Sequence, residues 1–170
     1  QTGFARTGKK FAWMHEDAKP DIVTVGKALG GGVLPVSAAV GTKDVMQVFH
    51  PGDHGSTFGG NPLAAAVGLA AMAEMETDDY CARAERLGKQ FSSKIQALDC
   101  PEIIDLRGKG CLWGVEFGPS MDTVALTSSF MEHGLLTKET RHRTFRFAPP
   151  IIISEAEMDE GCARFEKSVR

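Results

Sequence analysis

The segment that most constrains the fold is a short β-branched run that stops at a lysine and breaks into glycines. Residues 22–32 read IVTVGKALGGG. Ile, Val and Thr favour strands and glycines end them, so the pattern predicts a buried strand at Ile22–Val25 that carries Lys27 into a glycine-rich turn. Glycine lets a backbone approach a ligand closely, and a desolvated amine is favoured in the neutral, nucleophilic form that Schiff-base chemistry requires. The competing interpretation is a solvated lysine at a strand end.

Composition limits the class of function. The 170 residues are 42% hydrophobic and 24% charged, which is typical of globular proteins. A net charge of −3 and a pI near 6.0 give no electrostatic support for a nucleic-acid or anionic-membrane partner. The Ala-rich stretch from Leu63 to Met75 is too short to span a bilayer and contains Glu74. The four cysteines have no zinc-site spacing, so we expect no metal site and interpret them as reduced thiols of an intracellular protein.

The first part of the chain alternates short strands with turns. After the strand at Ile22–Val25 we expect a second buried strand at Val36–Val40 and a short helix at Asp44–Phe49. A glycine-rich loop at residues 54–60 leads to Asn61-Pro62, which is typical of a helix start with Asn as the N-cap and Pro in the first turn. This helix is expected to reach about Glu76. Residues 1–78 are therefore interpreted as the end of an α/β sheet domain.

The pattern changes after residue 78. Apolar residues at helical spacing predict one helix with a single buried stripe, made of Tyr80, Ala84, Leu87, Phe91, Ile95 and Leu98. Further short strands are expected at Ile103–Leu106, Leu112–Phe117, Leu135–Lys138 and Phe145–Ala148. A helix near Met121–Glu132 is expected to end at Gly134, and Ser154 with Glu157 forms a capping box that opens the last helix. Residues 79–170 are therefore expected to form a compact α+β domain.

Four motifs follow one another along the chain. They are QTGFARTG at residues 1–8, GKALGGG at 26–32, GSTFGGNP at 55–62 and FRFAPP at 145–150. In this order and at these spacings they resemble the class III (ornithine/ω-amino) aminotransferases, which are pyridoxal 5'-phosphate (PLP) enzymes of fold type I. The segments GLLTKET at 134–140 and 145–152 are most similar to the members that act on ornithine. The resemblance covers essentially the whole chain.

The resemblance implies an aspartate aminotransferase-like architecture. Residues 1–78 would be the C-terminal part of the PLP-binding large domain and 79–170 the C-terminal small domain. The intact enzyme would then have a portion upstream of residue 1, and that portion would include an Asp paired with the pyridine nitrogen of the cofactor. A sheet built from its last strands alone leaves an open edge. We therefore expect that these 170 residues do not form a stable monomer by themselves.

The resemblance also assigns roles to individual residues. Lys27 matches the lysine that forms the Schiff base with PLP and then moves the substrate proton. Gln1 matches a glutamine that hydrogen-bonds near the pyridine oxygen. Thr57, with Ser56, matches the loop that binds the cofactor phosphate across the dimer interface. Arg146 matches the arginine whose guanidinium fork holds the substrate α-carboxylate.

Structural interpretations compete with each of these roles. Gln1 is otherwise an ordinary terminal polar residue, and the loop that contains Thr57 is otherwise a solvated loop. Arg146 could instead form a structural ion pair. Trp13 and Trp113 are interpreted as packing residues. A nucleotide phosphate loop at 26–32 is disfavoured because Lys27 precedes the glycines and no Ser or Thr stands beside it.

The implied activity is PLP-dependent transamination by a homodimer with shared active sites. The δ-amino group of ornithine would pass to 2-oxoglutarate and give glutamate 5-semialdehyde and glutamate. The alternative within the class is an aminotransferase for acetylornithine, 4-aminobutyrate or another ω-amino acid. The alternative of another class is a catalytically inactive fragment or dimerisation module. The expected location is the mitochondrial matrix or the cytoplasm.

Overall fold

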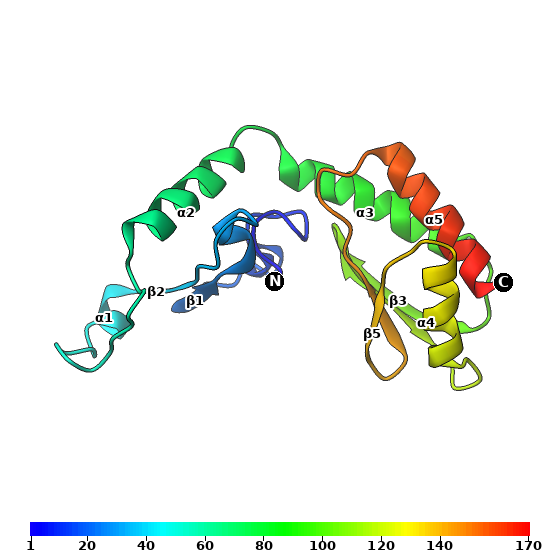
Figure 1. Ribbon diagram of the computed structural model, residues 1–170, viewed down its shortest axis with the longest axis horizontal. Coiled ribbons are helices and arrows are strands. Elements are labelled where there is room, and N and C mark those ends of the chain that lie inside the picture. Colours follow the sequence, from blue (N-terminus) through cyan, green and yellow to red (C-terminus); the bar gives the residue numbers. More distant parts are fainter. The chain divides into compact units, whose positions relative to one another are not determined.

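The computed structural model describes residues 1–170, which form two compact units (Figure 1). The first unit consists of Gln1–Phe4 and Lys9–Asp79. The second consists of Ala5–Gly8 and Tyr80–Arg170. The short segment Ala5–Gly8 therefore packs with a unit that lies far from it in the sequence.

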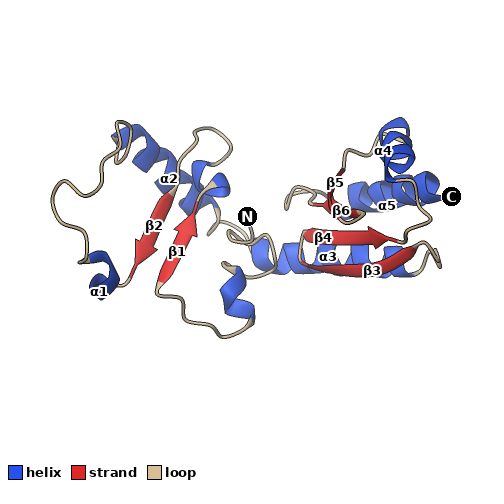
Figure 2. Cartoon of the chain, turned by 90° about the horizontal axis from the view of Figure 1, so that it is seen from below, coloured by secondary structure: helices blue, strands red, loops and turns tan.

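The first unit is built around a two-stranded antiparallel sheet (Figure 2). Its elements are η1 (Ala12–His15), β1 (Ile22–Val25), η2 (Lys27–Gly30), β2 (Ala38–Gly41), α1 (Lys43–Met46) and α2 (Pro62–Glu74). The predicted strand at Ile22–Val25 is confirmed. The start of α2 is also confirmed, because the side chain of Asn61 accepts a hydrogen bond from the Ala64 amide at 2.8 Å.

Two expectations for the first unit are wrong. The second strand begins at Ala38 rather than Val36. Val36 and Ser37 lie instead beside the glycine turn, where a Cβ on Gly26 would approach the Ser37 side chain to 3.3 Å. The strands are also not buried, since Ile22 is 53% exposed. No second layer of this unit covers that side chain, and the β-branched pattern by itself does not reveal what covers a strand.

The second unit is a four-stranded antiparallel sheet with strand order β3-β4-β6-β5. Its elements are α3 (Tyr80–Gln96), β3 (Ile103–Lys109), β4 (Leu112–Phe117), α4 (Thr123–Glu132), β5 (Lys138–Arg141), β6 (Thr144–Phe147) and α5 (Glu155–Val169). The capping box at Ser154 and Glu157 is confirmed at the start of α5. No helix of the chain combines the length and the apolar character that a membrane crossing needs.

The core of the second unit lies between one face of this sheet and the three helices α3, α4 and α5. Five phenylalanines form its centre, with neighbouring ring centroids 5.3 to 6.4 Å apart. They are Phe117, Phe130, Phe145, Phe147 and Phe165. The predicted stripe on α3 supplies the buried residues Ala84, Leu87, Phe91 and Ile95. Sheet and helices therefore bury their apolar faces against each other.

The strand expected at Leu135–Lys138 is wrong, because β5 occupies Lys138–Arg141. The amide of Leu135 donates to the Phe130 carbonyl at 2.8 Å, and that of Gly134 to the Met131 carbonyl at 2.9 Å. Gly134 has φ +74°. This pattern closes α4 with a glycine cap, so Leu135 packs as part of a helix end and the strand begins later.

Candidate functional site

Lys27 follows directly on β1, as the sequence predicts. Gly26 continues the extended backbone with φ −174°, and Lys27 then turns into the left-handed region with φ +50°. A residue other than glycine rarely adopts this conformation, which costs on the order of 1 kcal/mol or more. Gly31 caps the following turn with φ +58°. The glycines thus allow a sharp turn that fixes the lysine at the end of the strand.

Lys27 and Gln1 line the same cavity. The cavity has a volume of about 290 Å³ and lies within the first unit. Its other lining residues are Thr2, Gly3, Phe4, Phe11, Ala12, Trp13 and residues 23–26 and 28. The structure therefore brings together two residues to which the resemblance assigns roles at one cofactor, and the end of β1 lines the same cavity.

Trp13 is a cavity residue that the sequence interpretation treated only as packing. Its ring stacks on Phe11, with centroids 6.1 Å apart and an interplanar angle of 8°. Its Nε1 atom is buried and has no hydrogen-bond partner. A buried donor without a partner is costly, so such a group marks a position where an acceptor is favoured. No sequence pattern around Trp13 could have indicated this.

Ser56 and Thr57 lie in an exposed loop just before α2. The Ser56 hydroxyl accepts a hydrogen bond from the Gly59 amide at 3.1 Å. The Thr57 hydroxyl has no hydrogen-bond partner within residues 1–170. Neither residue lines the cavity that holds Lys27. The structure leaves the Thr57 hydroxyl available to a ligand but does not bring it to that cavity.

Arg146 lies on β6 in the second unit, between the buried Phe145 and Phe147. Successive residues of a strand face opposite sides, so Arg146 is exposed on the face away from the helices. Its neighbours in register are Gly114 and Lys138. The Arg146 guanidinium makes no ion pair within residues 1–170, so the competing structural ion pair is absent from this chain. The alternation also explains why an arginine interrupts an apolar run.

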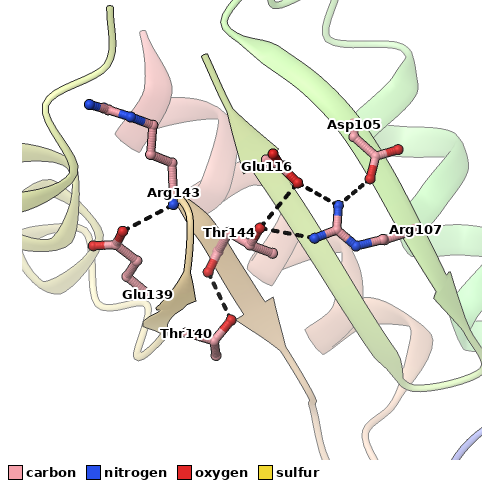
Figure 3. Close-up of polar contacts among 7 residues, drawn as sticks. All are labelled: Asp105, Arg107, Glu116, Glu139, Thr140, Arg143 and Thr144. Carbon is pink, nitrogen blue, oxygen red and sulfur yellow. Dashed lines mark hydrogen bonds and ion pairs between the residues drawn. The ribbon is translucent and has the colours of Figure 1, made fainter. Parts of the chain in front are cut away.

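A polar network of side chains joins strands β3, β4 and β6 (Figure 3). Arg107 forms an ion pair with Asp105, and its Nη1 atom lies 2.7 Å from a Glu116 carboxylate oxygen. Its Nη2 atom donates to the Thr144 hydroxyl at 3.0 Å. The bonds to Asp105 and Glu116 raise the pKa of the Arg107 guanidinium. The sequence interpretation missed this network, although alternation along β3, β4 and β6 places these residues on one face.

Nearly the whole chain matches one protein-family model. Residues 1–169 match the family model described as aminotransferase class-III. The chain belongs to the class III aminotransferases. It is 46% identical over 167 residues to the ornithine aminotransferase of Oceanobacillus iheyensis, and 45% identical to that of Staphylococcus carnosus. Each match covers 98% of this chain but 42% of the relative. This class III aminotransferase chain thus spans less than half the length of those relatives.

Solved structures agree with this assignment. The chain superposes on the ornithine aminotransferase of Toxoplasma gondii with a TM-score of 0.94 at 42% identity, covering 99% of this chain and 41% of that one. It also matches the acetylornithine aminotransferase of Elizabethkingia anophelis with a TM-score of 0.91 at 43% identity, covering 99% and 43%. The class III aminotransferase chain therefore has part of the fold type I architecture that the sequence predicts.

Proposed function

We propose that this class III aminotransferase chain is the C-terminal part of an enzyme that transfers the δ-amino group of ornithine to 2-oxoglutarate. The products are glutamate 5-semialdehyde and glutamate. The observation that carries the proposal is the cavity shared by Lys27 and Gln1. Relatives named ornithine aminotransferase at 45–46% identity support the choice of substrate.

The residues of this cavity fit PLP as the cofactor. Lys27 supplies an amine and Gln1 an amide, which suits a ligand with an aldehyde and a hydrogen-bond acceptor. When bound, PLP supplies the electron-withdrawing ring that stabilises charge on the substrate carbon next to the reacting nitrogen. Lys27 would hold the cofactor covalently through Nζ. Gln1 would donate a hydrogen bond without adding charge.

Lys27 has a second role in this proposal. Its Nζ would also act as the general base that accepts the proton from the substrate carbon and returns it during the transfer. The left-handed backbone at Lys27 sets the direction in which its side chain leaves the end of β1. Arg146 would hold a substrate carboxylate with its guanidinium fork, since the fork has no carboxylate partner within this chain.

We further propose that the first unit packs against more polypeptide, both the upstream part of the enzyme and a second subunit. It would correspond to the C-terminal part of the PLP-binding large domain, and the second unit to the small domain. The apolar side chains that the first unit exposes support this, among them Phe58 at 80% and Leu69 at 64%. Thr57 lies on this exposed surface, which is compatible with binding the phosphate of a cofactor in the neighbouring subunit.

A solved structure in the same family suggests a second candidate for the amino donor. The structural match to an acetylornithine aminotransferase at 43% identity supports acetylornithine as the second candidate. Initial rates of the full-length enzyme with ornithine, acetylornithine and 4-aminobutyrate as donors test this choice. A higher kcat/KM for ornithine is expected, and a preference for acetylornithine would replace it.

Borohydride reduction of the full-length protein, followed by peptide mass mapping, tests the cofactor site. A pyridoxyl group on Lys27 is expected, and none on the Lys27→Arg variant. Lys43→Arg, at an exposed lysine of the first unit, is the matched control and should label like the wild type. An unlabelled Lys27 in PLP-treated protein would make the chain an inactive fragment or a dimerisation module.

We also propose an intracellular location, in the cytoplasm or the mitochondrial matrix. All four cysteines are free thiols in the structure, as is typical of proteins in reducing compartments. Recovery of the thiols in reduced form from cell lysates prepared with an alkylating agent tests this proposal.

A further inference from the structure

Arg6 belongs to the first motif of the chain, and the proposed function gives it no role. It lies in Ala5–Gly8, the short segment that packs with the second unit. Its Nη1 atom donates to two backbone carbonyls, those of Cys111 at 3.2 Å and of Pro149. Its own carbonyl accepts from the Cys111 amide at 2.8 Å. One residue therefore connects the start of β4 with the chain that leaves β6.

The backbone around Arg6 is packed without space for side chains. A Cβ on Gly110 would lie 2.6 Å from the Arg6 carbonyl oxygen, and Gly110 has φ +54°. A Cβ on Gly88 of α3 would collide with the backbone carbonyl of the same Gly110. Ala5 is 1% exposed. The segment is thus held against the β3–β4 turn, and Arg6 has little freedom to move relative to the sheet.

Pro149, whose carbonyl accepts the bond from Arg6, follows Arg146 by three residues and lies just after the end of β6. Two residues before Arg146, the Thr144 hydroxyl accepts a hydrogen bond from Arg107 Nη2 at 3.0 Å. It donates to a Glu116 carboxylate oxygen at 3.3 Å (Figure 3). The strand is therefore tethered by side chains on both sides of Arg146. Between these tethers, the Arg146 guanidinium itself makes no ion pair within the chain.

We propose that Arg6 is a positioning residue for the carboxylate-binding Arg146. It holds the Pro149 carbonyl and so fixes the direction in which β6 presents the Arg146 side chain. The inference rests on the proposed function, because it takes Arg146 as the group that binds the substrate carboxylate. The Nη1 atom of Arg6 donates to both carbonyls, and a guanidinium is less strongly hydrated than a lysine amine, which suits this half-buried position.

The test uses the full-length enzyme with Arg6→Met and Arg6→Lys, assayed for kcat and for the KM of the 2-oxo acid. Arg6→Met is expected to raise KM about tenfold or more and to change kcat less than about threefold, since small displacements of a positioning group weaken binding strongly. Arg6→Lys should give an intermediate KM. Borohydride labelling of Lys27 should stay at the wild-type level in both variants.

Arg164→Met is the matched control. Arg164 also donates from Nη1 to two carbonyls, those of His133 at 3.5 Å and Gly134 at 2.9 Å, but at the end of α4 rather than β6. The Arg164→Met variant should have a lower melting temperature than the wild type but an unchanged KM for the 2-oxo acid. Equal changes of KM in Arg6→Met and Arg164→Met, or an unchanged KM in both Arg6 variants, would overturn the inference. If the wild-type enzyme carries no pyridoxyl label and no transaminase activity, the proposed function fails instead.

Discussion

The two units of the chain differ in how they bury their apolar side chains. Every buried hydrophobic residue except Ala64 belongs to the second unit. There three helices cover one face of a four-stranded sheet around the phenylalanine cluster. In the first unit, by contrast, Val33, Phe58 and Leu63 are more than 60% exposed. One unit has a complete core, whereas the other presents the surface of an incomplete one.

Helix α2 shows the difference most clearly. Its residues are apolar on all sides, and only Ala64 and Gly68 are buried. A helix of this kind is normally enclosed by other elements. Helix α3, in the second unit, is amphipathic and buries one stripe. Lys27, the proposed cofactor lysine, thus lies in the unit that exposes its apolar side chains, and Arg146 lies in the unit with its own core.

The largest effect is expected from separating the two units. A fragment of residues 80–170 should melt cooperatively, because nearly all the core residues come from it. This fragment should melt at a lower temperature than the second unit does in the 170-residue chain, because it lacks Ala5–Gly8. A fragment of residues 1–79 should show no cooperative transition by circular dichroism. A sharp transition in the shorter fragment would remove the contrast between the units.

A matched pair of phenylalanines sharpens the comparison within the intact protein. Phe165→Ala in the second unit should lower the free energy of unfolding by about 3–5 kcal/mol, because the ring is fully buried. Phe58→Ala, at a side chain that is 80% exposed, should change it by less than about 0.5 kcal/mol. Urea titrations followed by Trp113 fluorescence in a Trp13→Phe background report on Phe165→Ala in the second unit. Titrations followed by Trp13 fluorescence in a Trp113→Phe background report on Phe58→Ala in the first unit.

A large loss of stability in Phe58→Ala would instead mean that other polypeptide covers this ring in the sample. That result would be expected for the full-length dimer and not for residues 1–170 alone. Running the pair on both proteins therefore separates a surface that is truly solvated from one that is covered in the enzyme.

The same contrast explains how far the sequence could predict the structure. Helix α3, β4 and the start of α5 follow local patterns, so their predictions are confirmed. In the second unit, the elements that cover the apolar faces of these helices and strands belong to the same chain. Strand β5 was placed too early because Leu135 uses its amide to close α4. That hydrogen bond belongs to the local glycine cap at Gly134, which prevails over the strand tendency of the apolar residues that follow it.

The candidate site divides in the same way. The turn at Lys27 follows from its glycines, and the motifs relate it to Gln1. The contacts of Arg6 join residues that are 105 and 143 positions apart, and such pairings leave no local pattern. The buried Nε1 of Trp13 also depends on what surrounds the ring. Sequence motifs thus led to the proposed reactive groups, whereas the structure was needed to find the contacts of Arg6 and Trp13.

The smallest expected effect comes from a thiol in the core of the second unit. Burial raises the pKa of Cys162 to about 11, from an ordinary value of 9.0. Between these values the unfolded chain releases the proton while the folded unit keeps it, so the free energy of unfolding falls as the pH rises from 9 to 11. The loss should be roughly 1–3 kcal/mol, and below pH 9 this thiol should have no effect. Urea titrations from pH 7 to 11 should show a shallower decline in Cys162→Ala than in the wild type. If the free energy of unfolding declined equally with pH in both proteins, the Cys162 thiol would not be shielded from water in the core of the second unit.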